Sequence, residues 1–523
     1  MPHSLSPASR SPRPSPPTAA EDTMADVTMT EATNEAETKD VKLEDLFDDV
    51  DSDDEFSGSK PAQNKPSSPA AAAPTSPIDV ETDFKASDPE IMRMFYQRLF
   101  PWRYLFQWLN HSPTPTNDFS HREFALTLPG DIYSRYNSYP SADLLRKDIL
   151  LKMPSRFEIG PVYTTNLRDR KTMRNQSAFK PLSKELCFDI DLTDYDDIRT
   201  CCDKANICRR CWQFMTMAIK VVDAALREDF GFRHIMWVYS GRRGAHAWVC
   251  DRKARAMDDQ KRRAIAGYLE VIRGGAQSGK KVNIRRPLHP HLSRSLELLA
   301  PHFQQDVLES QDPWSTPERA EHLLSLLPDR SLNEGLRRKW DSSPGRGSAA
   351  KWADIDAVAK SGASGRHLDT RALLEAKQDV VLEYTYPRLD IEVSKKLNHL
   401  LKSPFVVHPG TGRVCVPIDA SSPASIEAFD PLAVPTVQGL LAEIDAWDDG
   451  GVKKEEEEEE GEGEAERRRT SAAKSLQDWE KTSLRPYIEF FRAFVLALMR
   501  DERDNNPRVK REREEEGGGG MEF

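Results

Sequence analysis

The strongest constraint on this chain is a run of alternating apolar and acidic side chains in residues 185–197, ELCFDIDLTDYDD. The period of two predicts a strand with Phe188 and Ile190 on one face and Asp189 and Asp191 on the other. Adjacent positions on one face lie roughly 6.5 Å apart, so both carboxylates can reach one dinuclear metal cluster. A half-buried strand with a solvated acidic face is the alternative, and the motif alone does not decide between the two.

Four of the seven cysteines follow this strand within eleven residues, at positions 201, 202, 208 and 211. Clustered cysteines in a reducing compartment favour metal binding over disulfides, and a Cys-x2-Cys pair is the usual arm of a tetrahedral zinc site. Four thiolates leave no ligand position for water, so we predict a structural zinc rather than a catalytic one. Buried free cysteines are the alternative.

The charge of the chain is unevenly distributed. Residues 1–80 contain 16 acidic and 6 basic side chains, whereas residues 81–523 contain 69 acidic and 68 basic ones. A neutral body is compatible with a local basic surface for a nucleic acid. The sequence has no apolar run of membrane-spanning length and no signal peptide, so we expect a soluble, intracellular protein.

Composition and periodicity predict a mixed α/β (α+β) fold with disordered ends. We expect strands at 121–128 and 386–393 and helices at 141–153, 212–230 and 258–272. The predicted organisation is: a disordered acidic, Pro-rich tail at 1–85; the first part of a catalytic domain at 86–289; a helical insertion at 290–380; the second part of that domain at 381–445; an acidic, disordered linker at 446–475; a C-terminal docking helix at 476–500; and a tail at 501–523.

A candidate phosphate site lies in residues 235–250, where two apolar strands flank Gly-Arg-Arg-Gly at 241–244 and predict a hairpin. Glycines let backbone N–H groups approach a triphosphate, two arginines supply bidentate donors, and His246 can add a third. A basic surface turn is the alternative. Residues 274–281, GGAQSGKK, resemble a P-loop, but a helix precedes them and Lys281 replaces the Ser/Thr that would hold magnesium.

Residues 386–393, YPRLDIEV, alternate in the same way as the first motif and place Arg388, Asp390 and Glu392 on one face. Lysines and histidines then concentrate in residues 395–408. Strand carboxylates, an arginine turn and a Lys/His cluster are together the components of two-metal nucleotidyl transfer. The later acids Asp194, Asp196 and Asp197 are expected in a loop or at a helix start and are not predicted to be ligands.

Four segments, residues 185–197, 201–212, 239–251 and 386–419, resemble the signature segments of the small, catalytic subunits of eukaryotic DNA primases, within the archaeo-eukaryotic primase superfamily. The resemblance covers roughly residues 88–445 and the last helix. It implies the primase catalytic fold, with a small β-sheet, a helical subdomain and a structural zinc knuckle formed by Cys201, Cys202, Cys208 and Cys211. The long N-terminal extension and the Glu-rich linker lie outside it.

The resemblance also implies roles for individual residues. Asp189, Asp191 and Asp390 correspond to the metal-binding catalytic triad. Glu123 corresponds to a glutamate required for activity, and the sequence gives no mechanism for it. The implied nucleotide-binding residues are Arg135, Asp189, Asp191, Ser240, Gly241, Arg242, Arg243, Gly244, His246, Arg388, His399, Leu400, Leu401, Lys402 and His408.

The family joins ribonucleoside triphosphates on a single-stranded DNA template, with two Mg²⁺ or Mn²⁺ ions, to make a short RNA primer. Its members work in the nucleus with a large iron–sulfur subunit, inside the DNA polymerase alpha–primase assembly. Two alternatives stay open: a primase-polymerase for damage tolerance, and a non-catalytic zinc scaffold of a replication complex.

Overall fold

The computed structural model describes residues 88–272, 282, 284–361, 368–458 and 476–504, without the side chains of 449–458. The tail predicted at 1–85, the glycine-rich 274–281 segment and most of the tail predicted at 501–523 lie outside these residues. In the part of the chain that is described, no helix is both long and apolar enough to cross a membrane.

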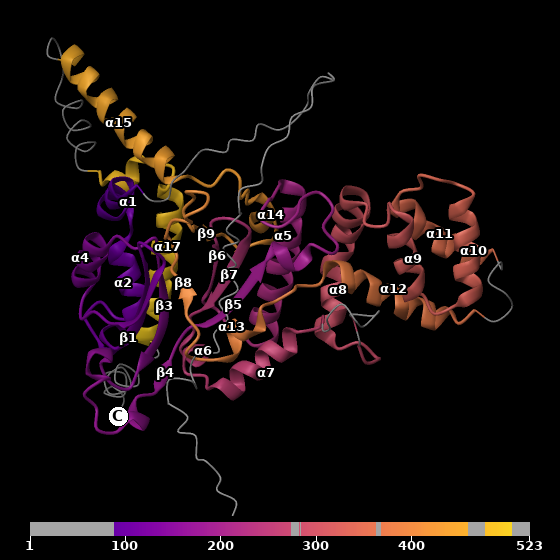
Figure 1. Ribbon diagram of the computed structural model, residues 1–523, viewed down its shortest axis with the longest axis horizontal. Helices are drawn as coiled ribbons and strands as arrows, with labels where there is room; N and C mark the ends of the chain where they lie inside the picture. The colour runs from indigo at the N-terminus through magenta and orange to yellow at the C-terminus, as the bar shows by residue number, and fades with distance from the viewer. Residues whose placement is uncertain (1–87, 273–281, 283, 362–367, 459–475, 505–523) are drawn as a thin grey trace, which may run out of the picture. The chain divides into compact units, whose positions relative to one another are not determined.

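Two antiparallel sheets form the centre of the described fold (Figure 1). The first has the order β2-β1-β3-β4, with β8 pairing to β3, and the second has the order β5-β7-β6-β9. The strands are β1 (Arg122–Leu128), β2 (Ile132–Asn137), β3 (Arg156–Tyr163), β4 (Pro181–Ser183), β5 (Leu186–Asp191), β6 (Ile235–Tyr239), β7 (Gly244–Val249), β8 (Leu401–Lys402) and β9 (Pro417–Ile418).

The predicted aspartate strand is β5, and its faces are as the alternation requires. Phe188 and Ile190 are fully buried in the core, while Asp189 and Asp191 lie on the opposite, more accessible face. The predicted hairpin is formed by β6 and β7, and β7 pairs with β5 so that Asp189 is opposite His246. The aspartates and the hairpin turn therefore share one sheet.

Helices surround the two sheets. They are α1 (Pro89–Met94), α2 (Trp102–Asn110), α3 (Asn117–Ser120), α4 (Ala142–Lys152), α5 (Arg209–Ala224), α6 (Arg252–Arg255), α7 (Asp259–Leu269), α8 (Pro290–His302), α9 (Pro317–Leu326), α10 (Arg330–Asp341), α11 (Ser348–Lys360), α12 (Thr370–Thr385), α13 (Ile391–Lys395), α14 (Pro423–Ala428), α15 (Val437–Glu458) and α17 (Arg485–Asp504). Three π-helical segments, η1 (Phe95–Leu99), η5 (Ala225–Asp229) and η6 (Phe303–Gln311), continue α1, α5 and α8 in the described residues.

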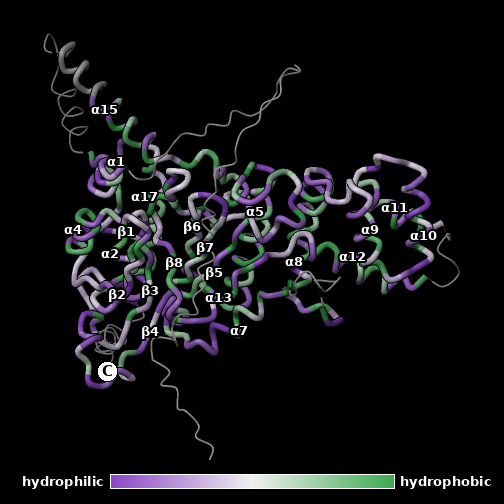
Figure 2. Tube along the Cα trace, viewed as in Figure 1, coloured by the Kyte–Doolittle hydropathy of each residue, from purple (hydrophilic) through white to green (hydrophobic). Residues whose placement is uncertain are grey.

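Residues 290–380 are helical, as their sequence pattern predicts. Helices α8 to α12 gather on one side of α5, which contacts β7 with its other flank (Figure 1). Figure 2 shows hydrophobic and hydrophilic residues interleaved along these helices, as expected where one helix face is buried. Pro317 opens α9 behind the N-cap Thr316, and Asp329 caps α10, so the two helix starts carry the expected capping residues.

Two sequence predictions are wrong. Residues 386–393 do not form a strand, because only Asp390 pairs with β5, and its side chain then accepts a hydrogen bond from the Glu392 N–H to cap the short helix α13. The linker predicted to be disordered from 446 begins as a helix, since α15 continues to Glu458. Alternation marks a strand only when a partner strand runs alongside several residues, which β5 does not offer here.

The last helix, α17, docks on the body as predicted. Its buried face consists of Ile488, Phe491, Val495 and Leu498. The Phe491 ring packs edge-on against Trp108 of α2, with 5.9 Å between ring centroids, and lies 5.2 Å from Phe405. At its far end Glu502 pairs with the buried Arg255. The C-terminal helix therefore completes the core between distant segments.

Candidate active site

Three carboxylates meet at the open end of β5. Asp189 and Asp191 come from the strand itself, and Asp390 precedes α13 nearly two hundred residues later. The backbone N–H of Asp390 donates to the Asp189 carbonyl oxygen at 3.1 Å, which fixes the two residues side by side. The structure thus brings together the three aspartates that the sequence singled out, although the segment carrying Asp390 is a helix N-terminus and not a strand.

The electrostatics of this cluster are those of crowded acids. Burial raises the pKa of Asp189 to about 7, and the neighbouring Asp191 and Asp390 carboxylates add to the rise. A fourth carboxylate, Asp194, joins them: burial, Asp191 and Asp390 raise its pKa to about 6. Asp194 lies in a 3-10 turn, η4 (Leu192–Tyr195), as predicted, but its nearness to the site was not foreseen.

The arginine turn after β6 adjoins the aspartates. The Arg243 Nε donates to both oxygens of Asp191 at 2.8 Å. Gly241 has φ of +90°, and a Cβ there would lie 2.5 Å from the His408 Cβ, so only glycine fits. A Cβ on Gly244 would lie 2.6 Å from the Ile190 carbonyl oxygen. Both glycines therefore allow the turn to pack against the aspartate strand and the His408 loop.

A cluster of cations faces the carboxylates. Burial lowers the pKa of His408 to about 3, with Lys402, Arg242 and Arg243 lowering it further. Lys402 also lowers the pKa of Asp189 and of His246, so its ammonium group lies close to both. Lys402, Arg242 and Arg243 form the cationic half of the site, and His408, which its lowered pKa keeps neutral at physiological pH, lies among them.

His246 lies between the two halves. It is buried, with its Nε2 3.4 Å from an Asp189 oxygen, and burial followed by Lys402 lowers its pKa to about 3. It is therefore neutral at physiological pH and can donate one N–H. Ser240 contributes inside the turn, where its Oγ accepts the Gly244 N–H at 2.9 Å.

The segment His399–Lys402 enters the first sheet as β8. Leu401 and Lys402 pair with Ile159 and Glu158 of β3, and Leu400 packs over Gly160. Burial lowers the pKa of His399 to about 4, and the backbone carbonyl of His399 accepts a hydrogen bond from the Lys184 ammonium group. Lys402 thus reaches the site from the end of a strand that is anchored in the other sheet.

Glu123 lies apart from the aspartates. It is fully buried on β1, and its oxygens accept hydrogen bonds from Arg135 Nε at 3.0 Å, Tyr136 N at 3.1 Å and Tyr163 OH at 3.0 Å. Arg135 also donates to the Asn398 carbonyl oxygen at 3.4 Å, directly before His399. Glu123 therefore contacts the site through Arg135 and the His399–Lys402 segment.

Arg388 binds the turn that follows Asp191. Its NH1 donates to the Asp194 carbonyl oxygen at 2.6 Å and pairs with Asp197, while its guanidinium lies over the Tyr195 ring. The Tyr195 hydroxyl in turn accepts a hydrogen bond from the Arg388 backbone N–H at 3.0 Å. Arg388 ties the segment before Asp390 to the turn after Asp191.

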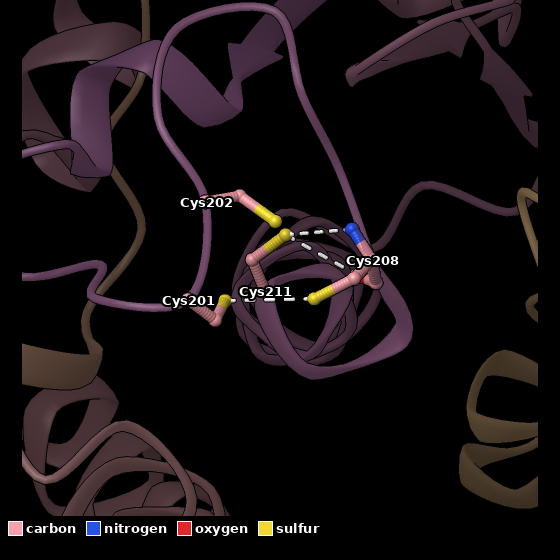
Figure 3. A group of neighbouring side chains, drawn as sticks. All are labelled: Cys201, Cys202, Cys208 and Cys211. Atoms are coloured by element: carbon pink, nitrogen blue, oxygen red, sulfur yellow. Dashed lines mark hydrogen bonds between the residues drawn. The ribbon is translucent and has the colours of Figure 1, made fainter. Parts of the chain in front are cut away.

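The four clustered cysteines form a second centre (Figure 3). Their sulfur atoms all lie within 4.8 Å of one another. Cys208 and Cys211 come from the start of α5, and Cys201 and Cys202 from the loop before it, with the side chains converging. This donor set fits a tetrahedral metal ion such as zinc.

Polar groups around the cysteines direct donors at the sulfurs. The buried Gln311, at the end of η6, donates to Cys201 Sγ at 3.3 Å and accepts the Thr200 N–H at 2.9 Å. Hydrogen bonds from Cys211, Gln311 and Cys208 lower the pKa of the Cys201 thiol despite its burial. The cluster thereby connects the helical segment 290–380 to α5 and β5.

Comparison with known proteins agrees with this geometry. The family model of the DNA primase small subunit matches residues 188–420, which include both aspartate segments, the arginine turn and the cysteines. The DNA primase small subunit of Schizosaccharomyces pombe is 53% identical over 420 residues, covering 80% of this chain and 91% of the relative. That of Saccharomyces cerevisiae is 41% identical over 428 residues (81% and 95%), and that of Drosophila melanogaster 38% over 416 residues (77% and 94%).

By its fold and site, the chain is a mixed α/β protein in which acidic and cationic side chains converge and which also carries a four-cysteine cluster. Within that class, the chain belongs to the DNA primase small subunit family.

Proposed function

We propose that this chain is a nucleotidyltransferase that synthesises short RNA primers de novo on single-stranded DNA for replication, from ribonucleoside triphosphates. Membership of the primase small subunit family carries the coarse function, primer synthesis. The observation that carries the chemistry is the convergence of Asp189, Asp191 and Asp390 with Arg242, Arg243, Lys402 and His408.

The aspartates would hold the metal ions. Clustered carboxylates, of which Asp191 and Asp390 raise the pKa of Asp189 and Asp194, form a donor set of the hard oxygen type that Mg²⁺ and Mn²⁺ prefer, and a divalent cation relieves their repulsion. Two such ions supply activation of a 3′-hydroxyl and neutralisation of a leaving pyrophosphate. Asp189, Asp191 and Asp390 are the proposed ligands, with Asp194 as a nearby negative charge.

The cationic cluster would bind the triphosphate. Arg242 and Arg243 can bind phosphate oxygens bidentately, Lys402 adds a point charge, and the turn at Ser240, Gly241 and Gly244 brings backbone close to the ligand. His246 and His408, both neutral, each offer one N–H donor. Because Arg243 also pairs with Asp191, one arginine would contact both the phosphate and the carboxylate cluster.

Glu123 and Arg388 act as positioning residues in this proposal. Glu123 holds Arg135, which holds Asn398 and so the nucleotide-binding stretch His399, Leu400, Leu401 and Lys402. Arg388 fixes the chain just before Asp390 to the turn at Asp194 and Asp197. Neither side chain contacts the three proposed ligand carboxylates in the hydrogen bonds and ion pairs of the described residues.

The cysteine cluster would hold a structural Zn²⁺. By family membership we further propose a large iron–sulfur subunit as partner, action within the DNA polymerase alpha–primase assembly, and a nuclear location. The boundaries at 86–289, 290–380 and 381–445 stay proposals in the same sense.

The deciding experiment uses Asp189→Asn and Asp191→Asn in the full chain, assayed for primer synthesis on unprimed single-stranded DNA. Asn preserves shape and removes the charge that binds metal, so synthesis should fall at least a thousandfold, a cost of roughly 4 kcal/mol in transition-state stabilisation. Asp196→Asn is the matched control, because that carboxylate pairs with Arg199 outside the site. Unchanged synthesis by both variants would favour the non-catalytic scaffold, and a preference for deoxyribonucleotides would favour the primase-polymerase alternative.

A further inference from the structure

A cationic face lies outside the aspartate site, on α4 and on the segment between β3 and β4. Residues 144–182 contain nine basic and three acidic side chains, in a chain whose residues 81–523 contain nearly equal numbers of each. Five of these basic residues define the cationic face: Lys147, Arg168, Arg170, Lys171 and Arg174. All are exposed except Arg170, which is half-buried.

The five cations of this face have no carboxylate partners among the described residues, although Asp148, which pairs with Lys152, and Asp169 lie nearby in the sequence. In the described part of the chain, none of the five makes an ion pair with a carboxylate, whereas cations elsewhere on the surface do, such as Arg294 with Asp229 and Arg337 with Glu321. Arg168 donates to the Ser138 carbonyl oxygen at 3.3 Å, and Arg170 lies 4.0 Å from the centre of the Tyr136 ring. Clustered positive charge without counter-charge matches a polyanion.

The face also has a hollow of about 430 Å³, with apolar and polar side chains in its lining. Two of its cations, Lys147 and Arg168, line this hollow together with Tyr136, the leucines Leu144 and Leu151, and Lys152, which pairs with Asp148 at 2.8 Å. Leu144 and Leu151 are 44% and 77% exposed. Apolar surface for bases beside cations for phosphates is the combination that single-stranded nucleic acids use.

The cationic face is connected to the proposed active site through β2. Tyr136, against which Arg170 packs, follows Arg135, and Arg135 donates to Asn398 beside the His399–Lys402 segment. Phe179, at the other end of the basic segment, stacks on Tyr163 at 4.3 Å, and the Tyr163 hydroxyl donates to Glu123. A strand held on this face is therefore held by the same scaffold that positions the nucleotide-binding residues.

We propose that the cationic face binds the phosphodiester backbone of the single-stranded DNA template. That the bound DNA is the template rests on the proposed function, whereas the proposal that this face binds single-stranded DNA does not. A protein partner fits less well, because all five cations would have to be desolvated in its interface with no counter-charge from this chain.

The test measures the affinity of the full chain for a labelled single-stranded oligodeoxynucleotide by fluorescence anisotropy, across a series of salt concentrations. Lys171→Glu/Arg174→Glu should weaken binding about tenfold near 0.1 M salt. It should also reduce the slope of log K against log salt by about 1.4, since each lost phosphate contact removes about 0.7 for a single strand. Its midpoint of thermal unfolding should be unchanged, because both side chains are exposed.

The matched control is Arg492→Glu/Arg500→Glu, which makes the same charge change at exposed positions of α17 and should leave affinity and slope unchanged. A second variant, Lys147→Gln/Arg168→Gln, neutralises the hollow without reversing charge and should weaken binding by a smaller factor. Apparent KM for the nucleoside triphosphate should stay the same in both face variants.

Two outcomes would overturn the proposal. One is wild-type affinity and slope in Lys171→Glu/Arg174→Glu. The other is unchanged DNA binding combined with loss of a co-expressed larger primase subunit, which would assign the face to a protein. Failure of the proposed function can be distinguished from failure of this proposal. A wild-type chain that binds DNA through this face but makes no primer would refute only the proposed function. If both hold, Asp189→Asn should lose synthesis and keep its affinity for DNA.

Discussion

At the scale of single residues, Glu123 is the clearest case of a side chain that acts through another. All of its described hydrogen-bond partners belong to the first sheet: Arg135, Tyr136 and Tyr163. The absence of a side chain at Gly160 leaves the space that the Glu123 methylene groups occupy. A Cβ at Gly160 would lie 2.9 Å from the Glu123 Cβ. Its negative charge is buried because the Arg135 guanidinium compensates it.

We expect Glu123→Gln to reduce kcat/KM for the triphosphate about tenfold or more. The amide oxygen can still accept from the Tyr136 N–H, but the NH2 group that replaces the other oxygen cannot accept from the Tyr163 hydroxyl, and the charge-assisted bond to Arg135 is lost. Steady-state kinetics on unprimed DNA measures this. A positioning role also requires that Mn²⁺ affinity, followed by calorimetry, stay at the wild-type value, whereas Asp189→Asn should lose it. Loss of Mn²⁺ affinity in Glu123→Gln would instead make Glu123 part of the metal site.

His291 makes the stability of the protein depend on pH. It is 2% exposed on α8, its Nε2 lies 2.8 Å from the Tyr386 hydroxyl, and burial lowers its pKa to about 4. An unfolded histidine has a pKa of about 6.5, so between pH 6.5 and 4 the unfolded chain binds a proton that the folded chain does not. Stability from this residue is therefore complete above pH 6.5 and is lost as the pH falls towards 4.

Thermal unfolding of wild type and His291→Gln at several pH values tests this. Between pH 7 and pH 5, the melting temperature of the wild type should fall further than that of the variant, because glutamine does not titrate. His322→Gln is the control, since that side chain is 41% exposed on the same subdomain. Parallel curves for wild type and His291→Gln would show that His291 is protonated equally in both states.

At the scale of elements, the cysteine cluster joins three of them: the loop after β5, the start of α5 and the end of η6. Gln311 makes the third connection, through Cys201 Sγ and the Thr200 and Cys201 N–H groups. Residues that orient metal ligands typically contribute 10- to 100-fold to metal affinity. The helical segment should therefore stabilise the metal, and the metal should stabilise the docking of that segment.

Gln311→Ala should weaken zinc binding roughly tenfold by competition with a chromophoric chelator, while Cys208→Ser should lower bound zinc and the melting temperature more strongly. Gln304→Ala is the matched control, since its amide bonds only the exposed Glu309. Folded, zinc-free protein should keep turnover. Complete loss of activity in such protein would contradict a structural role for the metal.

The elements also show what the sequence could predict. The alternation at 186–191 and the two apolar runs around Gly-Arg-Arg-Gly are local, and both were confirmed as β5 and the β6–β7 hairpin. The same alternation at 386–393 was wrong, because strand formation depends on a neighbour, and the neighbour contributes one residue pair. The acidic run near 455 predicted disorder, but α15 continues into it as far as Glu458.

The site was predictable in its residue types and not in its contacts. Asp189 and Asp191 share a face by strand geometry alone, whereas Asp390 needed the family resemblance to join them. Nothing local indicated that Arg243 pairs with Asp191, that Asp194 lies near the other carboxylates, or that Arg388 pairs with Asp197. Each of these depends on a loop whose path is set by long-range packing.

At the scale of the whole molecule, the two sheets are joined by segments from both ends of the described chain. Trp108 of α2 packs edge-on against Trp248 of β7, with ring centroids 5.2 Å apart, and against Phe491 of α17. The buried pair of Arg122 with Glu185, 2.7 Å apart, connects β1 to the residue just before β5. The aspartate strand is thus held from behind by elements that are distant in sequence.

We expect the C-terminal helix to be essential for the fold rather than an appendage. Deleting residues 485–523 removes the buried faces of Ile488, Phe491, Val495 and Leu498 and exposes Trp108, so the full body should lose cooperative unfolding. Phe491→Ala alone should cost about 3–5 kcal/mol of unfolding free energy, the usual range for a buried phenylalanine. Chemical denaturation followed by tryptophan fluorescence measures both, and Trp108 is a reporter within the affected core.

Deletion of residues 505–523 alone is the control and should leave the transition unchanged. If the chain without residues 485–523 unfolded at the wild-type midpoint, α17 would be a detachable element, and the two sheets would have to be held together by Arg122–Glu185 and the Trp108–Trp248 contact.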